Sequence, residues 1–555
     1  MIGVIANGAD QEVAREFFEL FKTPWEFYRP GQPYEVVLCA AEVPIEVAAK
    51  LVLVYSGRKT RFDDEQNIFI GHQICEFRIL AYKDTQLPIY GSTVSFHREG
   101  TALLAHHESG ECAAFFGQVG GSAFVRIGYD LFAEIRALLT TGQPPAQAHI
   151  PTLELHIALL RLWILGCGIP VEEIPPVPEG YRFIACLTHD VDHPFLRKHK
   201  WDHTSIGFLF RTVVLWFWDL IGGRTTLQNV VTNWVATLKL PFIHLGLAKD
   251  FWSDFDERYA AAEQGLPSTF FVIPFEGRKG IGIEGAAPKR RAAGYGARDV
   301  AGIIRRLRNT GHEVCLHGID AWCDPEKARE EIEEILRLTG TAEIGVRMHW
   351  LYQNGQTASV LDQAGADYDS TAGYGVTVGY RAGSTQAFKP FGADRLLELP
   401  MHAMDTALFY LSYLGLNHRE AMERLAPMFE SATRFGGCMT INWHDRSLAP
   451  ERLWGRSYGE ILAELRKRDP WFATAGDAVA WFRKRRGARF VTAAGEPGKA
   501  QVARPGADCA RELPGLRLRT YQPRTIGEFE WPSVEDYIDQ PLEEVGAGVP
   551  ALRER

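Results

Sequence analysis

Short apolar runs alternate with amphipathic stretches along the middle of the chain. Runs of strand length and β-rich composition lie at 183–188, 269–274, 313–316, 343–347, 396–399 and 438–443. Between them, residues 299–309, 325–338 and 358–364 carry apolar residues at helical spacing. Such alternation over about 270 residues predicts an α/β fold with a parallel sheet, open or closed into a (β/α) barrel.

The same patterns divide the chain into parts. Residues 1–168 contain strand-like runs at 36–40, 51–55 and 124–128 and a helical stretch at 131–139, which predict a separate α/β domain. Four prolines between 169 and 180 indicate a linker. The barrel is expected at 181–484. It is interrupted at 204–245 by a Trp- and Phe-rich helical insertion and followed at 485–555 by a C-terminal extension.

Charge and composition narrow the class of protein and its compartment. The chain has 60 Lys and Arg against 69 Asp and Glu, a net charge of −9, which argues against a broad nucleic-acid surface. Nine cysteines without a CxxC pair, and an N-terminus that does not resemble a signal peptide, favour a cytoplasmic protein. The apolar run at 206–221 is short for a membrane span and contains Arg211 and Asp219. It packs on the domain or makes a peripheral membrane contact.

Ionisable residues gather where the predicted strands end. Asp190 and Asp192 follow one strand and share a face, and His317 ends another. Since the carboxyl ends of parallel strands meet at one edge, these groups are expected to form a single site. One Asp and two His would make a nitrogen-rich ligand set that suits Zn²⁺ with an open position for water. The predicted ligands are Asp192, His317 and His349, with Asp320 as the alternative to His349.

The order of these motifs resembles that of the polysaccharide deacetylase family, carbohydrate esterase family 4, which contains the nodulation-protein deacetylase homology domain. The motifs are Thr188-x-Asp190-x-Asp192, then Gly311-His-Glu-Val-x-x-His317, an Arg347-x-His349 segment and a late Trp-His444. The resemblance covers roughly residues 181–450 and is strongest to the O-antigen and exopolysaccharide type of deacetylase. It implies a distorted (β/α) barrel and one divalent metal, most simply Zn²⁺.

The resemblance also implies roles for individual residues. Asp190 would be the base, and Asp192 would bind metal. His444 would protonate the departing amine and Arg347 would tune Asp190. The chain departs from the family's usual His-x3-His motif, because position 321 is Ala. The expected substrate contacts are Arg381, Asp369, Tyr374, Trp350 and His402.

The predicted function is removal of an N-acyl group, acetyl in the simplest case, from a saccharide or lipid-linked glycan precursor. Because the second metal-binding His of the usual motif is missing, the alternative is a non-catalytic saccharide-binding protein on the same barrel. Another metal-dependent hydrolase on this scaffold is a third possibility, since fold alone does not set chemistry. The sequence leaves open the sugar, the role of the N-terminal domain and the oligomeric state.

Overall fold

The computed structural model describes residues 1–41, 47–97, 102–119, 121–199, 203–210, 212, 220–223, 225–493, 496–503, 512–542 and 544–545. The chain forms two compact units. Unit 1 comprises Met1–Gly180, Ala382–Ser384 and Trp481–Arg555, and unit 2 comprises Tyr181–Arg381 and Thr385–Ala480.

Unit 1 contains a mixed sheet with one parallel half. The parallel strands lie in the order β2 (Trp25–Phe27), β1 (Ile2–Ile5), β3 (Tyr34–Cys39), β4 (Ala49–Tyr55) and β11 (Ser122–Ile127). The sheet continues antiparallel with β10 (Cys112–Val119), β9 (Leu104–His106), β6 (Arg78–Tyr82) and β7 (Thr85–Ile89). Strand β8 (Thr93–Phe96) pairs with β10 and with β5 (Ile70–Ile74). The strands predicted near 36–40, 51–55 and 124–128 are therefore confirmed.

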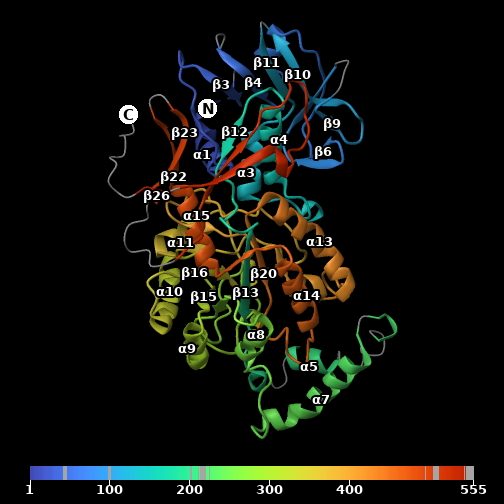
Figure 1. The fold of residues 1–555 in the computed structure, drawn as a ribbon. Helices are drawn as coiled ribbons and strands as arrows, with labels where there is room; N and C mark the ends of the chain where they lie inside the picture. Colours follow the sequence, from blue (N-terminus) through green and yellow to red (C-terminus); the bar gives the residue numbers. More distant parts are fainter. Residues whose placement is uncertain are drawn as a thin grey trace. The chain divides into compact units, whose positions relative to one another are not determined.

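Helices and two small sheets complete unit 1 (Figure 1). The helices are α1 (Gln11–Phe21), α2 (Arg61–Glu65), α3 (Leu131–Thr140), α4 (Thr152–Leu165) and the end of α15 (Ala475–Gly487). Part of the Pro-rich segment is ordered as β12 (Val171–Glu173), which pairs with β24 (Arg517–Tyr521), and β24 pairs with β25 (Tyr537–Pro541). The other small sheet contains β22 (Ala488–Ala493), β23 (Glu496–Ala503) and β26 (Glu544–Val545).

Unit 2 is a distorted (β/α) barrel, as predicted. Its parallel strands are β18 (Leu397–Glu398), β17 (Tyr368–Asp369), β16 (Gly345–Met348), β15 (Glu313–Gly318), β14 (Thr269–Val272), β13 (Ile184–Val191), β20 (Cys438–Asn442) and β19 (Ala403–Met404), with β21 (Trp471–Ala473) beside β13. Among the residues that the structure describes, no pairing joins β18 to β19, so the barrel stays open there. Strand β13 is buried along its whole length, which suits its apolar run at 184–187, and its polar residues Thr188, His189 and Asp190 are buried as well.

Seven helices accompany the barrel strands within the described residues. They are α8 (Phe255–Glu263), α9 (Ala301–Asn309), α10 (Pro325–Thr339), α11 (Thr357–Ala364), α12 (Asp405–Phe409), α13 (His418–Phe435) and α14 (Gly455–Arg466). At the start of α10, the Asp324 side chain accepts hydrogen bonds from the first-turn N–H groups of Glu326 and Lys327, and Pro325 occupies the first position. The helix ends at Gly340, whose φ of 66° suits glycine.

The predicted insertion contains two helices within the described residues, α5 (His203–Phe210) and α7 (Leu227–His244). One face of α7 packs Ala236, Leu240 and Ile243 into a cluster with Phe251 and Trp252. The membrane contact predicted for 206–221 lies partly outside the described residues, at 211 and 213–219. Within the described part of the chain, no helix is both long enough and apolar enough to cross a membrane.

Candidate active site

Three side chains at the carboxyl ends of β13, β15 and β16 bring their donor atoms together. Asp192 Oδ1 lies 3.3 Å from His317 Nε2 and 3.3 Å from His349 Nδ1, and the two histidine nitrogens are 3.1 Å apart. A tetrahedral ion with bonds of about 2.0–2.1 Å separates its ligand atoms by roughly 3.3 Å. The triangle therefore has the size of three corners of a zinc site.

The surroundings of these residues leave their lone pairs available to a cation. His317 Nδ1 lies 3.0 Å from the carbonyl of Arg347, to which it donates, so Nε2 is the nitrogen that faces the triangle. Burial lowers the pKa of His349 despite the neighbouring Asp192, which favours the form of the ring that can bind a cation. Burial would raise the pKa of Asp192, but His349 and His317 hold it well below its usual range. This donor set fits a divalent metal.

A tight backbone turn presents His349. Strand β16 ends at Met348, and the next two residues after His349, Trp350 and Leu351, have φ angles of 65° and 54°. These left-handed conformations are rare for residues other than glycine. The turn directs the His349 ring back toward β15, so the strained backbone serves the candidate metal site.

Asp190 is held beside the triangle by a network of buried side chains. Arg347 Nη1 donates to Asp190 Oδ1 at 3.0 Å, and the Asn442 side-chain amide donates to Oδ2 at 2.8 Å. The guanidinium of Arg347 is fixed by Thr188 and Ser370. Burial would raise the pKa of Asp190, but Arg347, followed by His317, lowers it overall. Asp190 is therefore ionised at neutral pH.

A second charged pair lies on the other side of the triangle. His444 Nδ1 is 2.6 Å from Asp405 Oδ1, and Asp405 also accepts the backbone N–H of His444 at 2.7 Å. The opposite ring nitrogen, Nε2, lies 3.8 Å from Asp192 Oδ2. Burial lowers the pKa of His444, but Asp405 outweighs it and raises the pKa to about 10. His444 is thus protonated, with Nε2–H directed toward the triangle.

These groups line one cavity of about 510 Å³. Its wall also contains aromatic and cationic side chains, which are Trp350, Tyr410, Tyr413, Trp454, Arg290, Arg291, Arg446 and Arg452. Trp350 and Tyr413 are 40% and 43% exposed. Arg290 lies over the Trp350 ring, and Arg452 lies over Tyr410.

The structure separates the predicted site residues into two groups. Six of them line the cavity: Asp190, Asp192, His317, His349, His444 and Trp350. Arg347 is not a lining residue but forms an ion pair with Asp190. Asp369, Tyr374, Arg381 and His402 are not among the lining residues that the structure describes. Asp369 and His402 are buried, and His402 Nδ1 accepts a hydrogen bond from the backbone N–H of Thr440. Arg381 donates a hydrogen bond to the carbonyl of Gly373.

Asp320, the alternative ligand, lies apart from the triangle. Its Oδ1 accepts the backbone N–H of Ile281 at 2.7 Å, and its Oδ2 lies 3.4 Å from Lys327 Nζ. Among the described residues, the cluster with metal-ligand spacing contains Asp192, His317 and His349 and does not include Asp320. The carboxylate of Asp320 instead stabilises the loop at 280–281.

Sequence reasoning missed several residues of the site. Asp405 orients His444, Asn442 holds Asp190, and Asp445 lies in the cavity wall, where burial raises its pKa to about 7. Arg446 and Arg452 also face the cavity. For Asp405, the signal in the sequence was its position directly after strand β19.

No protein-family model and no curated protein matches this chain. Solved structures of low identity do match. A protein from Mycobacterium smegmatis named as a polysaccharide deacetylase is 19% identical, with a TM-score of 0.35, over 56% of this chain and 95% of its own. One from Pseudomonas aeruginosa PAO1 with the same designation is 15% identical, with a TM-score of 0.35, over 58% and 97%. Puue allantoinase is 16% identical, with a TM-score of 0.34, over 55% and 92%.

Proposed function

We propose that unit 2 is a metal-dependent hydrolase that removes an N-acyl group, acetyl in the simplest case, from a saccharide. The observation that carries the proposal is the triangle of Asp192, His317 and His349, flanked within one cavity by an ionised Asp190 and a protonated His444. Hydrolysis of an amide needs an activated water, stabilisation of the oxyanion and a proton for the departing nitrogen. The cavity offers a group for each of these.

Each side chain has a role that follows from its surroundings. Asp192, His317 and His349 would hold a divalent cation, which would supply Lewis acidity and activate a water at neutral pH. Asp190, kept ionised by Arg347, accepts the proton of the attacking water. His444 donates its Nε2 proton to the departing amine, while Asp405 holds the ring and its charge in place. Arg347 and Asp405 are positioning residues.

Support for a saccharide comes from the rest of the cavity wall and from the motifs. Exposed rings such as Trp350 and Tyr413 can stack on the apolar face of a sugar. The arginines around them can donate to hydroxyl or acidic oxygens. Of the five predicted substrate contacts, we assign Trp350 alone to the substrate surface, because Asp369, Tyr374, Arg381 and His402 lie away from the cavity lining.

The decisive experiment measures bound metal and acetate release together. Full-length protein, His349→Ala and Asp320→Asn are analysed for metal by mass spectrometry and assayed with N-acetylated saccharides. We expect one divalent cation per chain in the wild type and in Asp320→Asn. We expect His349→Ala to lose the metal and at least about 10³-fold in activity, because metal-ion catalysis contributes several kcal/mol.

Other outcomes would point elsewhere. Unchanged metal content in His349→Ala would exclude His349 as a ligand. A wild-type protein that holds no metal and releases no acetate would favour the non-catalytic saccharide-binding alternative. A metal-loaded protein that hydrolyses other amides but no N-acetylated saccharide would retain the hydrolase and reject the substrate class.

A further inference from the structure

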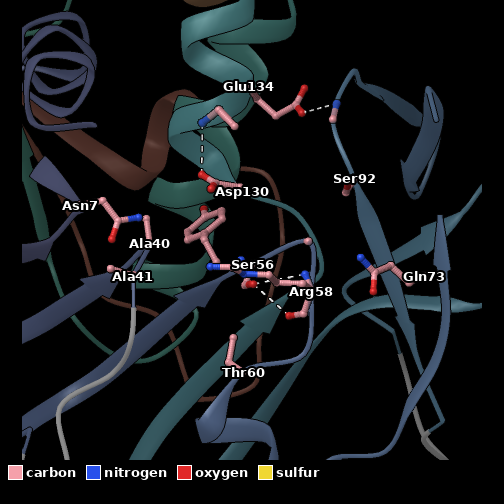
Figure 2. Close-up of a pocket in the computed structure, with 14 residues that line it drawn as sticks. Asn7, Ala40, Ala41, Ser56, Arg58, Thr60, Gln73, Ser92, Asp130 and Glu134 are labelled. Atoms are coloured by element: carbon pink, nitrogen blue, oxygen red, sulfur yellow. Dashed lines mark hydrogen bonds between the residues drawn. The ribbon is translucent and has the colours of Figure 1, made fainter. Parts of the chain in front are cut away.

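Unit 1 contains a cavity of about 410 Å³ at the carboxyl edge of its parallel strands. The residues that follow four of these strands line it: Asn7 after β1, Ala40 and Ala41 after β3, Ser56–Arg58 after β4, and Asp130 after β11. The volume lies within the range of roughly 300–1,000 Å³ that is usual for small-molecule sites. Figure 2 shows Asn7, Asp130 and Gln73 on different sides of this space.

The cavity lies at a reversal of the strand order. From β1 the chain passes through α1 to β2 on one side, and it then returns to β3 on the other side of β1. The loops after β1 and β3 therefore diverge and leave a crevice between Asn7 and Ala40. Ligands of open α/β sheets bind in such crevices, because the diverging loops create a concave surface there.

Buried contacts fix the walls of the cavity. The guanidinium of Arg126, paired with the buried Asp63, donates to the carbonyls of Ser56 and Arg58 and holds the loop after β4. Both oxygens of Glu134 accept backbone N–H groups of the facing loop, from Tyr90 and Gly91, at 2.7 Å. A side chain at Gly57 would lie only 2.1 Å from the carbonyl oxygen of Ser92, so the two loops meet closely because residue 57 is glycine.

Within these fixed walls, several polar groups face the cavity without a partner. Among the residues that the structure describes, no hydrogen bond or ion pair is found for the side chains of Asn7, Arg58, Gln73 and Ser92, and the second carboxylate oxygen of Asp130 is also unbonded. They come from five segments of the chain and include amides, a hydroxyl, a guanidinium and a carboxylate. Asn7, Arg58 and Gln73 are exposed, so their donors and acceptors are accessible to a molecule that enters the cavity.

The charges identify the class of ligand. Phosphate groups often bind free N–H groups at a helix N-terminus, but Asp130 Oδ1 already accepts those of Phe132 and Ala133 at the start of α3. Among the described lining residues, Arg58 is the one cationic side chain, its charge acts on the Asp130 carboxylate, and Glu134 adds a second acidic side chain. An anion is therefore disfavoured, and the polar lining disfavours an apolar molecule. Hydroxyl groups, which both donate and accept, match this mixture.

We propose that the unit 1 cavity binds a neutral saccharide through Asn7, Arg58, Gln73, Ser92 and Asp130. This cavity belongs to unit 1 and the candidate metal site to unit 2. Because the proposal is tested by measuring binding, its result does not depend on the proposed catalytic function.

The test uses fluorescently labelled full-length protein on an array of neutral and acidic glycans, followed by titration calorimetry with the sugars that are retained. All proteins carry Asp190→Asn so that no substrate is consumed. Asp130→Asn keeps the helix cap but removes the charge, and Arg58→Ala removes the cation. Arg61→Ala, an exposed arginine in α2 outside the cavity lining, is the matched control.

We expect neutral glycans to be retained and their affinity to fall at least about tenfold in Asp130→Asn and Arg58→Ala, because each variant removes a hydrogen bond to a charged group. Arg61→Ala should bind like the parent, and inorganic phosphate should not compete. The proposal is overturned if no neutral glycan is retained, if the two cavity variants bind like the parent, or if phosphate displaces the glycan.

Discussion

Two cavities in this protein lie at the carboxyl ends of parallel strands, yet they differ in what their ionisable groups do. In unit 2, Asp190, Asp192, His317, His349 and His444 converge within one buried cluster. In unit 1, the acidic side chains near the cavity mostly accept hydrogen bonds from the backbone. Glu134 accepts the N–H groups of Tyr90 and Gly91, and one oxygen of Asp130 caps α3. The same edge of a sheet thus carries a cluster of ionisable groups with metal-ligand spacing in one unit and a polar cavity in the other.

The buried arginine–aspartate pairs show this difference most clearly. Arg126 binds both oxygens of Asp63, at 2.8 and 3.0 Å, and Thr60 donates to the same carboxylate, so Asp63 has no free face. Arg347 contacts Asp190 through a single nitrogen, and Asp190 still lines a cavity. A carboxylate that is fully bonded stabilises a loop, whereas one that keeps an open face can accept a proton.

The largest expected effect is on Asp190. Asp190→Asn should retain the metal, because Asp192, His317 and His349 are unchanged, but turnover should fall by about 10²–10⁴ because the proton acceptor is gone. Metal analysis and the rate of acetate release measure both at once. Asn442→Ala should have a milder effect, since it keeps the Asp190 carboxylate and removes two hydrogen bonds to Asp190, one to its carboxylate and one from its backbone N–H. Wild-type turnover in Asp190→Asn would contradict its role as base.

The next largest effect is on stability in unit 1. Arg126→Met leaves the carboxylate of Asp63 buried without its cation and should lower the free energy of unfolding by about 3–5 kcal/mol. Arg61→Ala, which breaks an exposed pair with Glu65, should cost no more than about 1 kcal/mol. Urea unfolding followed by circular dichroism compares the two variants, and metal content should change in neither. Equal unfolding midpoints would mean that the Arg126–Asp63 pair contributes no more than a surface pair.

The sequence was most informative where buried strands end in ionisable residues. Asp192, His317 and His349 each follow an apolar strand of the same parallel sheet, so their meeting could be predicted from strand period and topology. Strand period and topology do not distinguish His349 from Asp320 as the third ligand. Their positions depend on the backbone turn at Trp350 and on the hydrogen bond that Asp320 accepts from the N–H of Ile281.

Other residues of both cavities could not be predicted from patterns in the sequence. Strand β19 has only two residues, so nothing in its period distinguishes His402, which packs into the core, from Asp405, which orients His444. The unit 1 cavity is built from Asn7, Arg58 and Gln73, which are far apart in sequence and belong to no motif. Only the folding of the sheet brings them together.

The smallest expected effect, and the one that depends on pH, is on Asp405. His444 must be protonated to act as an acid, and its pKa is raised to about 10 chiefly because the Asp405 carboxylate outweighs burial. Activity should therefore persist below that pKa and decline as the pH rises through it. A bound divalent cation lowers the pKa of the nearby imidazolium, so the comparison is made between metal-loaded proteins.

Asp405→Asn keeps a hydrogen-bond acceptor for His444 but removes the negative charge, so the alkaline limb of kcat/KM should move toward neutrality. At pH 6 the variant should stay within roughly tenfold of the wild type, and the gap should widen as the pH rises, because only the protonated ring can donate. The measurement is kcat/KM as a function of pH for the wild type and Asp405→Asn, with the metal content of both proteins determined in parallel. A uniform loss at every pH would indicate that Asp405 merely positions the ring, and its charge would then have no part in the chemistry of the unit 2 cavity.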